Sequence, residues 1–160
     1  MTGSVAGLFA LVVGIIVAVV VGLSWRPRFA ARPLLNRSEI KLRSTVARML
    51  PQGLLIMAQV SYGKMLANKS RSRYLTVNAK RADMVICDND FNPLAVIEYQ
   101  GAGHNGSSWS SLIDTRRRDR QKRIALKEAG IPMIEVPARY RVEELRAMVQ
   151  DALGLTKGAA

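Results

Sequence analysis

The chain has 160 residues, which is enough for one ordinary domain and little more. It contains 24 Lys+Arg against 12 Asp+Glu, a formal net charge of +12, and no charged residue precedes Arg26. The chain therefore divides into an uncharged apolar head and a strongly basic body. The apolar runs of the body exclude intrinsic disorder. The single cysteine, Cys87, excludes a disulfide scaffold, and the apolar head does not fit a freely soluble protein.

The apolar head predicts a transmembrane helix over residues 4–25. Val5 to Leu23 carries no polar side chain and corresponds to about 28 Å of helix, close to the hydrocarbon thickness of a bilayer. A cleaved signal peptide fits less well, because no basic residue precedes the run and the run is too long. The arginines of residues 26–35, a basic linker suited to anionic headgroups, follow at once. The positive-inside rule therefore predicts a single-pass protein whose N-terminus lies outside and whose C-terminal domain is cytoplasmic.

Small residues recur every four positions along this predicted helix and therefore share one stripe. Such a stripe lets two membrane helices approach closely, which predicts self-association or a partner helix. The alternative is that glycine and alanine are simply common in membrane spans. The stripe consists of Ala6, Ala10, Gly14, Ala18 and Gly22.

The body predicts one α/β domain over residues 36–155. Asn36 begins a helix with Glu39 as its capping-box partner, and Pro51 follows its end. Later helices are expected at 113–129 and 142–153, a long loop beginning with a short helix at 63–80, and strands at 54–62, 82–88, 93–100 and 131–136. The order α-β-β-β-α-β-α indicates a mixed sheet flanked by helices.

The predicted hairpin of the second and third strands brings two carboxylates together. Strand side chains alternate between faces, and a four-residue loop at 89–92 places Asp83 opposite Glu98, with Cβ atoms about 5 Å apart. Two carboxylates this close repel, which raises one pKa or favours a bound cation such as Mg²⁺. The alternative is that Asp83 only pairs with Lys80 or Arg81, which precede its strand.

The helix after the third strand has two basic faces, because residues 114–123 contain no apolar side chain. Arg118 and Lys122 share a stripe with the small apolar residues Ala125 and Ala129. This stripe should pack on the sheet, so Arg118 and Lys122 should point inward, near Glu98. That inward pair would also compensate the acidic charges there. The opposite ridge suits a phosphate backbone, or alternatively a membrane surface, and consists of Arg116, Arg120, Arg123 and Lys127.

These residues resemble the PD-(D/E)xK arrangement of restriction-endonuclease-like nucleases, in which an Asp and a Glu-x-Lys segment lie on neighbouring strands. A closer resemblance, over roughly residues 34–137, is to an uncharacterised bacterial domain family of that fold. Its motifs appear here in order as Glu39, Gln59-Val60, Asp83-Met84-Val85, Ile97-Glu98-Tyr99-Gln100, His104, Arg118-Asp119 with Lys122, and Gly130-Ile131-Pro132.

The resemblance implies a restriction-endonuclease-like fold and a Mg²⁺ or Mn²⁺ ion bound by Asp83, Glu98 and the carbonyl of Tyr99. It also implies that Glu39 adds a further carboxylate. Such an ion activates a water and stabilises the charge that develops on a scissile phosphate. His104 is expected either to assist proton transfer or to hold a local hydrogen bond.

Two positions depart from the family pattern. Gln100 occupies the position of the motif lysine and cannot supply its positive charge, so Lys122 or Arg118 is expected to substitute. Glu135 stands on the last strand where a basic or neutral residue is expected.

The expected function is that of a bacterial inner-membrane protein that binds nucleic acid and acts as a metal-dependent endonuclease or exonuclease. Its expected nucleic-acid contacts are the outer ridge together with Arg118. The alternative, favoured by Gln100, is a non-catalytic module that binds DNA, lipid or protein. A third interpretation is an accessory subunit that acts through its apolar helix.

Overall fold

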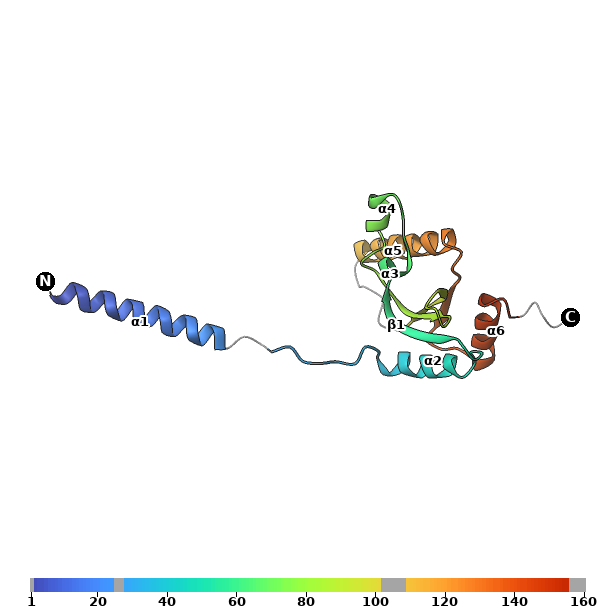
Figure 1. The fold of residues 1–160 in the computed structure, drawn as a ribbon, viewed down its shortest axis with the longest axis horizontal. Coiled ribbons are helices and arrows are strands. Elements are labelled where there is room, and N and C mark those ends of the chain that lie inside the picture. Colours follow the sequence, from blue (N-terminus) through green and yellow to red (C-terminus); the bar gives the residue numbers. More distant parts are fainter. Residues whose placement is uncertain (1, 25–27, 102–108, 156–160) are drawn as a thin grey trace. The chain divides into compact units, whose positions relative to one another are not determined.

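The computed structural model describes residues 2–24, 28–101 and 109–155. The chain forms two compact units, Met1–Arg32 and Pro33–Ala160 (Figure 1). The second unit contains the whole sheet and both clusters of buried apolar side chains described below, so it has a hydrophobic core of its own.

The first unit is built on helix α1 (Thr2–Ser24). Within the part of the chain that the structure describes, no helix is both long enough and apolar enough to cross a membrane. The predicted transmembrane helix over 4–25 is therefore not supported, and the single-pass inner-membrane location is corrected with it. The pairing of the small-residue stripe stays a prediction.

The second unit is a mixed α/β domain built on a four-stranded sheet. Its strands lie in the order β1-β2-β3-β4. The pairs β1–β2 and β2–β3 are antiparallel, whereas β3 and β4 are parallel. The strands are β1 (Leu55–Ser61), β2 (Arg81–Cys87), β3 (Pro93–Gln100) and β4 (Met133–Pro137), which confirms the four predicted strands to within two residues at each end.

Three long helices flank the strands in the predicted order: α2 (Arg37–Ala47), α5 (Trp109–Glu128) and α6 (Val142–Ala152). The segment after β1 contains the expected short helix, α3 (Tyr62–Met65), and a second one that was not predicted, α4 (Arg71–Leu75). Helix α5 begins four residues before the predicted start at residue 113.

Helices cover both faces of the sheet, because β2 and β3 carry apolar side chains on both sides. On one face, Met84 and Ile86 of β2 belong to a cluster with buried side chains of α2 and α6, such as Leu42 and Leu145. On the other face, Val85 belongs to a cluster that contains Tyr62, Val77, Val96 and Leu126 of α5. Figure 1 shows α5 on one side of β1 and α2 on the other. The β2–β3 hairpin is thus held in place from two sides.

The capping box of α2 is confirmed. Asn36 Oδ1 accepts a hydrogen bond from Glu39 N at 3.0 Å, and Glu39 Oε2 accepts one from Asn36 N at 2.8 Å. These bonds satisfy two backbone N–H groups at the start of the helix. The side chain of Glu39 is therefore engaged at the N-terminus of α2.

The hairpin has the predicted register over most of its length. Met84 pairs with Ile97 and Ile86 with Ala95, and a bulge between Ile86 and Cys87 shifts the pairing next to the turn. Because the bulge lies at the turn end, the regular register continues in the other direction and places Asp83 opposite Glu98. The bulge therefore leaves the two carboxylates on neighbouring strands.

Candidate functional site

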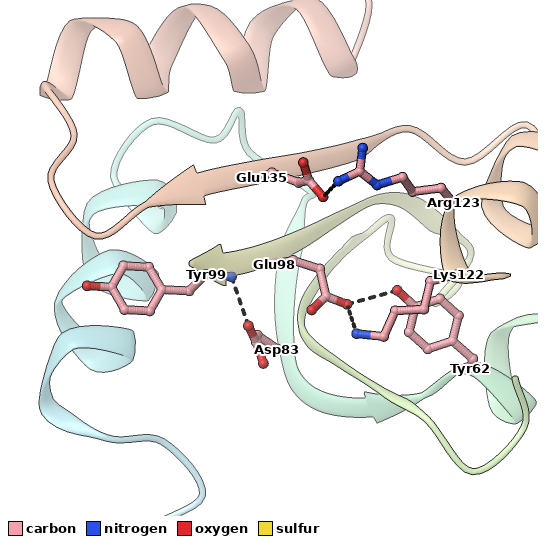
Figure 2. A network of polar contacts seen from close by, with 7 residues as sticks. All are labelled: Tyr62, Asp83, Glu98, Tyr99, Lys122, Arg123 and Glu135. Carbon is pink, nitrogen blue, oxygen red and sulfur yellow. Dashed lines mark hydrogen bonds and ion pairs between the residues drawn. The ribbon is translucent and has the colours of Figure 1, made fainter. Parts of the chain in front are cut away.

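The carboxylate of Glu98 lies at the centre of a polar network at the end of β3. Its Oε1 accepts a hydrogen bond from the hydroxyl of Tyr62 at 2.8 Å and one from Lys122 Nζ at 2.9 Å (Figure 2). The side chains of Lys122 and Glu98 are only 15% and 12% exposed, so this ion pair is largely removed from water. Three elements, β3, α3 and α5, thus meet at one carboxylate oxygen.

The surroundings of Glu98 have opposing effects on its pKa. Burial raises the pKa of Glu98, the Lys122 ammonium and the Tyr62 hydroxyl lower it, and the Asp83 carboxylate raises it again, with a net upward shift. The pKa of Tyr62 is also raised, first by burial and then by the Glu98 carboxylate, so Tyr62 keeps its proton and donates it to the hydrogen bond. The charge of Glu98 is therefore held by two donors.

Asp83 reaches the same place from β2. Its Oδ2 accepts a hydrogen bond from the backbone N–H of Tyr99 at 2.8 Å, which ties it to the residue next to Glu98. The second oxygens, Asp83 Oδ1 and Glu98 Oε2, accept no hydrogen bond from the described residues. Because no fully buried side-chain oxygen in the described part of the chain lacks a partner, both of these oxygens retain some contact with solvent. Figure 2 shows the two carboxylates side by side, beneath the end of β3.

This donor set fits one divalent cation of the Mg²⁺ type, which commonly takes one or two protein carboxylates and keeps several waters. The carbonyl of Tyr99 accepts a hydrogen bond from Gly101 N at 2.9 Å and retains one lone pair. Among the described residues, no group of three or more His, Cys, Asp and Glu side chains could hold a metal ion. The structure therefore offers two carboxylates and no larger metal cluster in that part of the chain, and metal binding itself stays a prediction.

Other predicted site residues lie elsewhere. Gln100 is the exposed last residue of β3, and its side chain makes no hydrogen bond to the described residues. Glu39 is engaged in the capping box and makes no hydrogen bond or ion pair with Asp83 or Glu98. His104 lies outside the described residues.

Helix α5 has the predicted orientation at its centre. Lys122 points inward to Glu98, and Leu126, one turn further along, is buried with 1% exposure. Ala129, which was expected on the packed stripe, is exposed instead, because it follows the last helical residue, Glu128, at the start of a turn. The inward face of α5 therefore ends before residue 129.

The outer ridge is only partly free. Arg120 and Lys127 are exposed, whereas Arg123 Nη2 forms an ion pair with Glu135 Oε1 of β4 at 2.6 Å (Figure 2). This pair gives Glu135, the second departure from the family pattern, a structural partner. The side chains of Arg116 and Arg118 lie outside the described residues.

Sequence reasoning missed Tyr62, which contributes the second donor to Glu98. Its only signal was its place at the end of the apolar run 54–62, where a tyrosine is as well explained by core packing. Its contact with Glu98 joins residues 36 positions apart in the chain, which no local pattern indicates.

One cavity of the described residues lies away from the carboxylates. It has a volume of about 440 Å³ and lies between α4 and α5, where Leu66, Tyr74, Val77, Gln121 and Ile124 are among its lining residues. None of Asp83, Glu98 and Lys122 lines it. The carboxylate site is therefore separate from this cavity.

Comparison with known proteins shows two relatives, which match this chain over similar numbers of residues. An uncharacterized protein of Sinorhizobium fredii is 37% identical over 127 residues, which cover 76% of this chain and 87% of that protein. An uncharacterized protein of Haemophilus influenzae is 31% identical over 121 residues, which cover 74% of this chain and 60% of that protein. The match thus spans less than two thirds of the second relative. No solved structure matches this chain.

The family described as "Protein of unknown function (DUF2726)" matches residues 31–153, which include the whole sheet, all the helices of the second unit and the carboxylate site. The chain therefore belongs to the DUF2726 family.

Proposed function

We propose that the unit Pro33–Ala160 has a restriction-endonuclease-like fold and hydrolyses phosphodiester bonds of nucleic acid with Mg²⁺ or Mn²⁺. The observation that carries the proposal is the convergence of Asp83, Glu98 and Lys122 from three different elements. Two acidic side chains and one ammonium at the end of a hairpin are the groups that the PD-(D/E)xK pattern requires. The lysine here comes from a helix and not from the strand.

The two oxygens that retain contact with solvent, Asp83 Oδ1 and Glu98 Oε2, are the atoms that would hold the metal, with the Tyr99 carbonyl as a further ligand. When bound, the ion supplies an activated water and stabilises negative charge on the phosphate. Lys122 supplies a fixed positive charge next to the carboxylates, held by its bond to Glu98. A preorganised cation of this kind stabilises the charge that develops on a transferring phosphate.

The basic character of the chain supports a nucleic-acid substrate. The net charge of +12 attracts the phosphate backbone of a nucleic acid, whatever its base sequence. On α5 the exposed Arg117, Arg120 and Lys127 lie on the helix that carries Lys122 into the site. Backbone contacts by these residues, together with the expected contacts of Arg116 and Arg118, would place a phosphate near the carboxylates.

A second function, a nucleic-acid-binding module without catalysis, is favoured by one observation. Lys122 and Tyr62 both donate to Glu98 Oε1, so side chains of the chain itself compensate the charge of this carboxylate. Gln100 lacks the motif charge. A binding module would keep the basic surface and use the network only for stability.

The test is a cleavage assay with residues 33–160, which contain the complete core of the unit. Supercoiled, linear and branched DNA would be incubated with Mg²⁺ or Mn²⁺ and with wild type, Asp83→Asn or Asp90→Asn. Asp83→Asn removes one ligand charge but retains an oxygen for Tyr99 N, whereas Asp90 is an exposed turn residue and serves as the control.

Cleavage by wild type and Asp90→Asn that falls about 100-fold or more in Asp83→Asn would support the nuclease, in line with the loss of a group that binds the catalytic ion. Intact DNA that is shifted equally by all three proteins would support the binding module. Intact DNA without a shift would contradict both functions.

A further inference from the structure

We propose that Tyr62 is a positioning residue of this site, which orients the Glu98 carboxylate so that Oε2 stays free for a divalent cation. The inference rests on the proposed function and assigns a role to a residue that the sequence pattern does not mark.

First, the hydrogen bond between Tyr62 and Glu98 joins a buried side chain to the site. Tyr62 is 0% exposed, and its hydroxyl donates to Glu98 Oε1 at 2.8 Å across 36 positions of the chain. Lys122 Nζ donates to the same oxygen at 2.9 Å. Two donors on one oxygen occupy its lone pairs and leave Oε2 as the oxygen that is available to a ligand. In Figure 2 Tyr62 and Lys122 approach Glu98 from the same side.

The second step is that Tyr62 contacts both charged groups. Lys122 Nζ lies 5.6 Å from the centroid of the Tyr62 ring, within the range of a cation–π interaction. The ring therefore attracts the ammonium while the hydroxyl binds the carboxylate. Tyr62, which is uncharged, thus contacts both members of the Lys122–Glu98 ion pair.

The third step is that the backbone of Tyr62 is itself fixed. Its N–H donates to Lys80 O at 2.9 Å, and the neighbouring Gly63 N donates to Asn78 O at 3.2 Å. A Cβ at Gly63 would lie only 2.8 Å from Tyr74 Oη and 3.0 Å from Asn78 O, so the chain there is tightly enclosed. A hydroxyl that is placed by a rigid backbone can hold a ligand side chain in one rotamer, as outer groups do around metal ligands.

The experiment measures binding of Mn²⁺ alone to residues 33–160 by calorimetry or by the electron paramagnetic resonance of free Mn²⁺. Tyr62→Phe keeps the ring and removes only the hydroxyl. Tyr140→Phe, which removes the hydroxyl of a half-buried tyrosine packed against the other cluster, is the matched control. Both variants are also made in a Glu98→Gln background, and thermal melting is recorded for every protein.

We expect Tyr62→Phe to weaken Mn²⁺ binding about three- to tenfold, and Tyr140→Phe to leave it unchanged. In the Glu98→Gln background, Tyr62→Phe should have no further effect, because the group that it orients has gone. A purely structural role would lower the melting temperature and reduce Mn²⁺ affinity equally in both backgrounds.

Two results would overturn the inference, and they differ. If wild type binds Mn²⁺ and Tyr62→Phe binds it equally well, Tyr62 does not position Glu98 and the proposed function is unaffected. If wild type itself does not bind Mn²⁺ at millimolar concentration, the metal-dependent function fails and the role of Tyr62 fails with it.

Discussion

Lys122 Nζ on helix α5 lies 2.9 Å from Glu98 Oε1 on strand β3, in an ion pair whose two side chains are 15% and 12% exposed. This pair brings an ammonium group to the strand end at which Gln100 has no charge to offer. An ion pair so far removed from water is costly to break, because removal of one partner leaves the other charge in a poorly solvated place. Removal of either Lys122 or Glu98 alone is therefore expected to lower the free energy of unfolding as well as to change the charge at the strand end.

The first prediction concerns the source of the positive charge. Lys122→Met should reduce DNA cleavage about 100-fold or more, because a preorganised cation next to the reacting phosphate is lost. Gln100→Ala should change it less than about threefold, since a neutral exposed side chain supplies no such charge. Initial cleavage rates at a temperature where both variants are folded provide the measurement.

Lys41→Met is the control for Lys122→Met, because it removes the same charge from an exposed position of helix α2. Equal cleavage by Lys122→Met and Lys41→Met would show that the inward ammonium has no part in the reaction.

The second prediction follows from the raised pKa of Glu98. The folded state binds the Glu98 proton more tightly than the unfolded chain, whose glutamate pKa is near 4.5. The stability that this group contributes is therefore fully present below pH 4.5 and is lost as the pH rises through the folded-state pKa. The melting temperature of wild type relative to Glu98→Gln should fall as the pH rises above 4.5.

Thermal melts of both proteins at closely spaced pH values would show this trend, and the use of a difference cancels the groups that the two proteins share. A difference that is constant with pH would mean that the Lys122 ammonium cancels the cost of burying the carboxylate, and a difference that increases with pH would mean that it outweighs that cost.

The third prediction separates Glu39 from the chemistry. Its Oε2 caps α2 through Asn36 N at 2.8 Å. Glu39→Ala should therefore lower the free energy of unfolding by about 1 kcal/mol, as loss of a helix cap does. DNA cleavage per folded molecule should stay within about twofold of wild type. Urea denaturation and a cleavage assay on the same preparations would check both values.

Asn36→Ala is the matched variant, since it removes the other half of the capping box. A large loss of cleavage in Glu39→Ala without a comparable loss in Asn36→Ala would restore Glu39 to the reaction, as the family resemblance implies.

The sequence predicts those features of the fold and the site that depend on contacts between residues close together in the chain. The capping box of Asn36 and Glu39 involves residues three positions apart, and the β2–β3 register depends on one short turn, so local patterns are sufficient for both. The inward direction of Lys122 follows from helical periodicity together with Leu126. Short-range patterns are therefore enough to bring Asp83, Glu98 and Lys122 together.

What the sequence did not predict depends on contacts between distant segments. Tyr62 reaches Glu98 because β1, which ends directly before Tyr62, and β3 both pair with β2. Arg123 on α5 meets Glu135 on β4, the strand that lies parallel to β3. Helix α4 was missed because its five residues, RSRYL, carry mostly polar side chains and no helical apolar period. Side-chain chemistry alone does not identify such partners.

The fourth prediction concerns the Arg123–Glu135 pair, whose side chains are 58% and 31% exposed. An ion pair this exposed contributes less than about 1 kcal/mol to stability. Glu135→Gln should leave stability nearly unchanged, release Arg123 for a phosphate contact and tighten duplex DNA binding about two- to fivefold at low salt. It should also steepen the salt dependence by about one phosphate contact. Fluorescence anisotropy at several salt concentrations provides the measurement.

Glu143→Gln, at an exposed position of α6, changes the net charge by the same amount and is the control. If Glu135→Gln and Glu143→Gln tighten binding equally, only the net charge matters and Arg123 makes no specific contact.

The fifth prediction concerns backbone strain beside the site. Gln59 has φ = 55° within strand β1, and the flanking pairs Ala58–Met84 and Val60–Ala82 place it opposite Asp83. A left-handed conformation costs a non-glycine residue about 1–2 kcal/mol, whereas glycine adopts it freely but loses more chain entropy on folding. Gln59→Gly should therefore stabilise the unit by about 0.5 kcal/mol, as measured by urea denaturation.

Met57→Gly, two residues earlier in the same strand, is the comparison, because Met57 has no positive φ and pairs regularly with Val85. Its substitution should destabilise the unit by about 1 kcal/mol. If both glycine variants lose the same stability, Gln59 carries no strain. If only Gln59→Gly gains stability while cleavage falls, the strain is retained at this position because it shapes the strand next to Asp83.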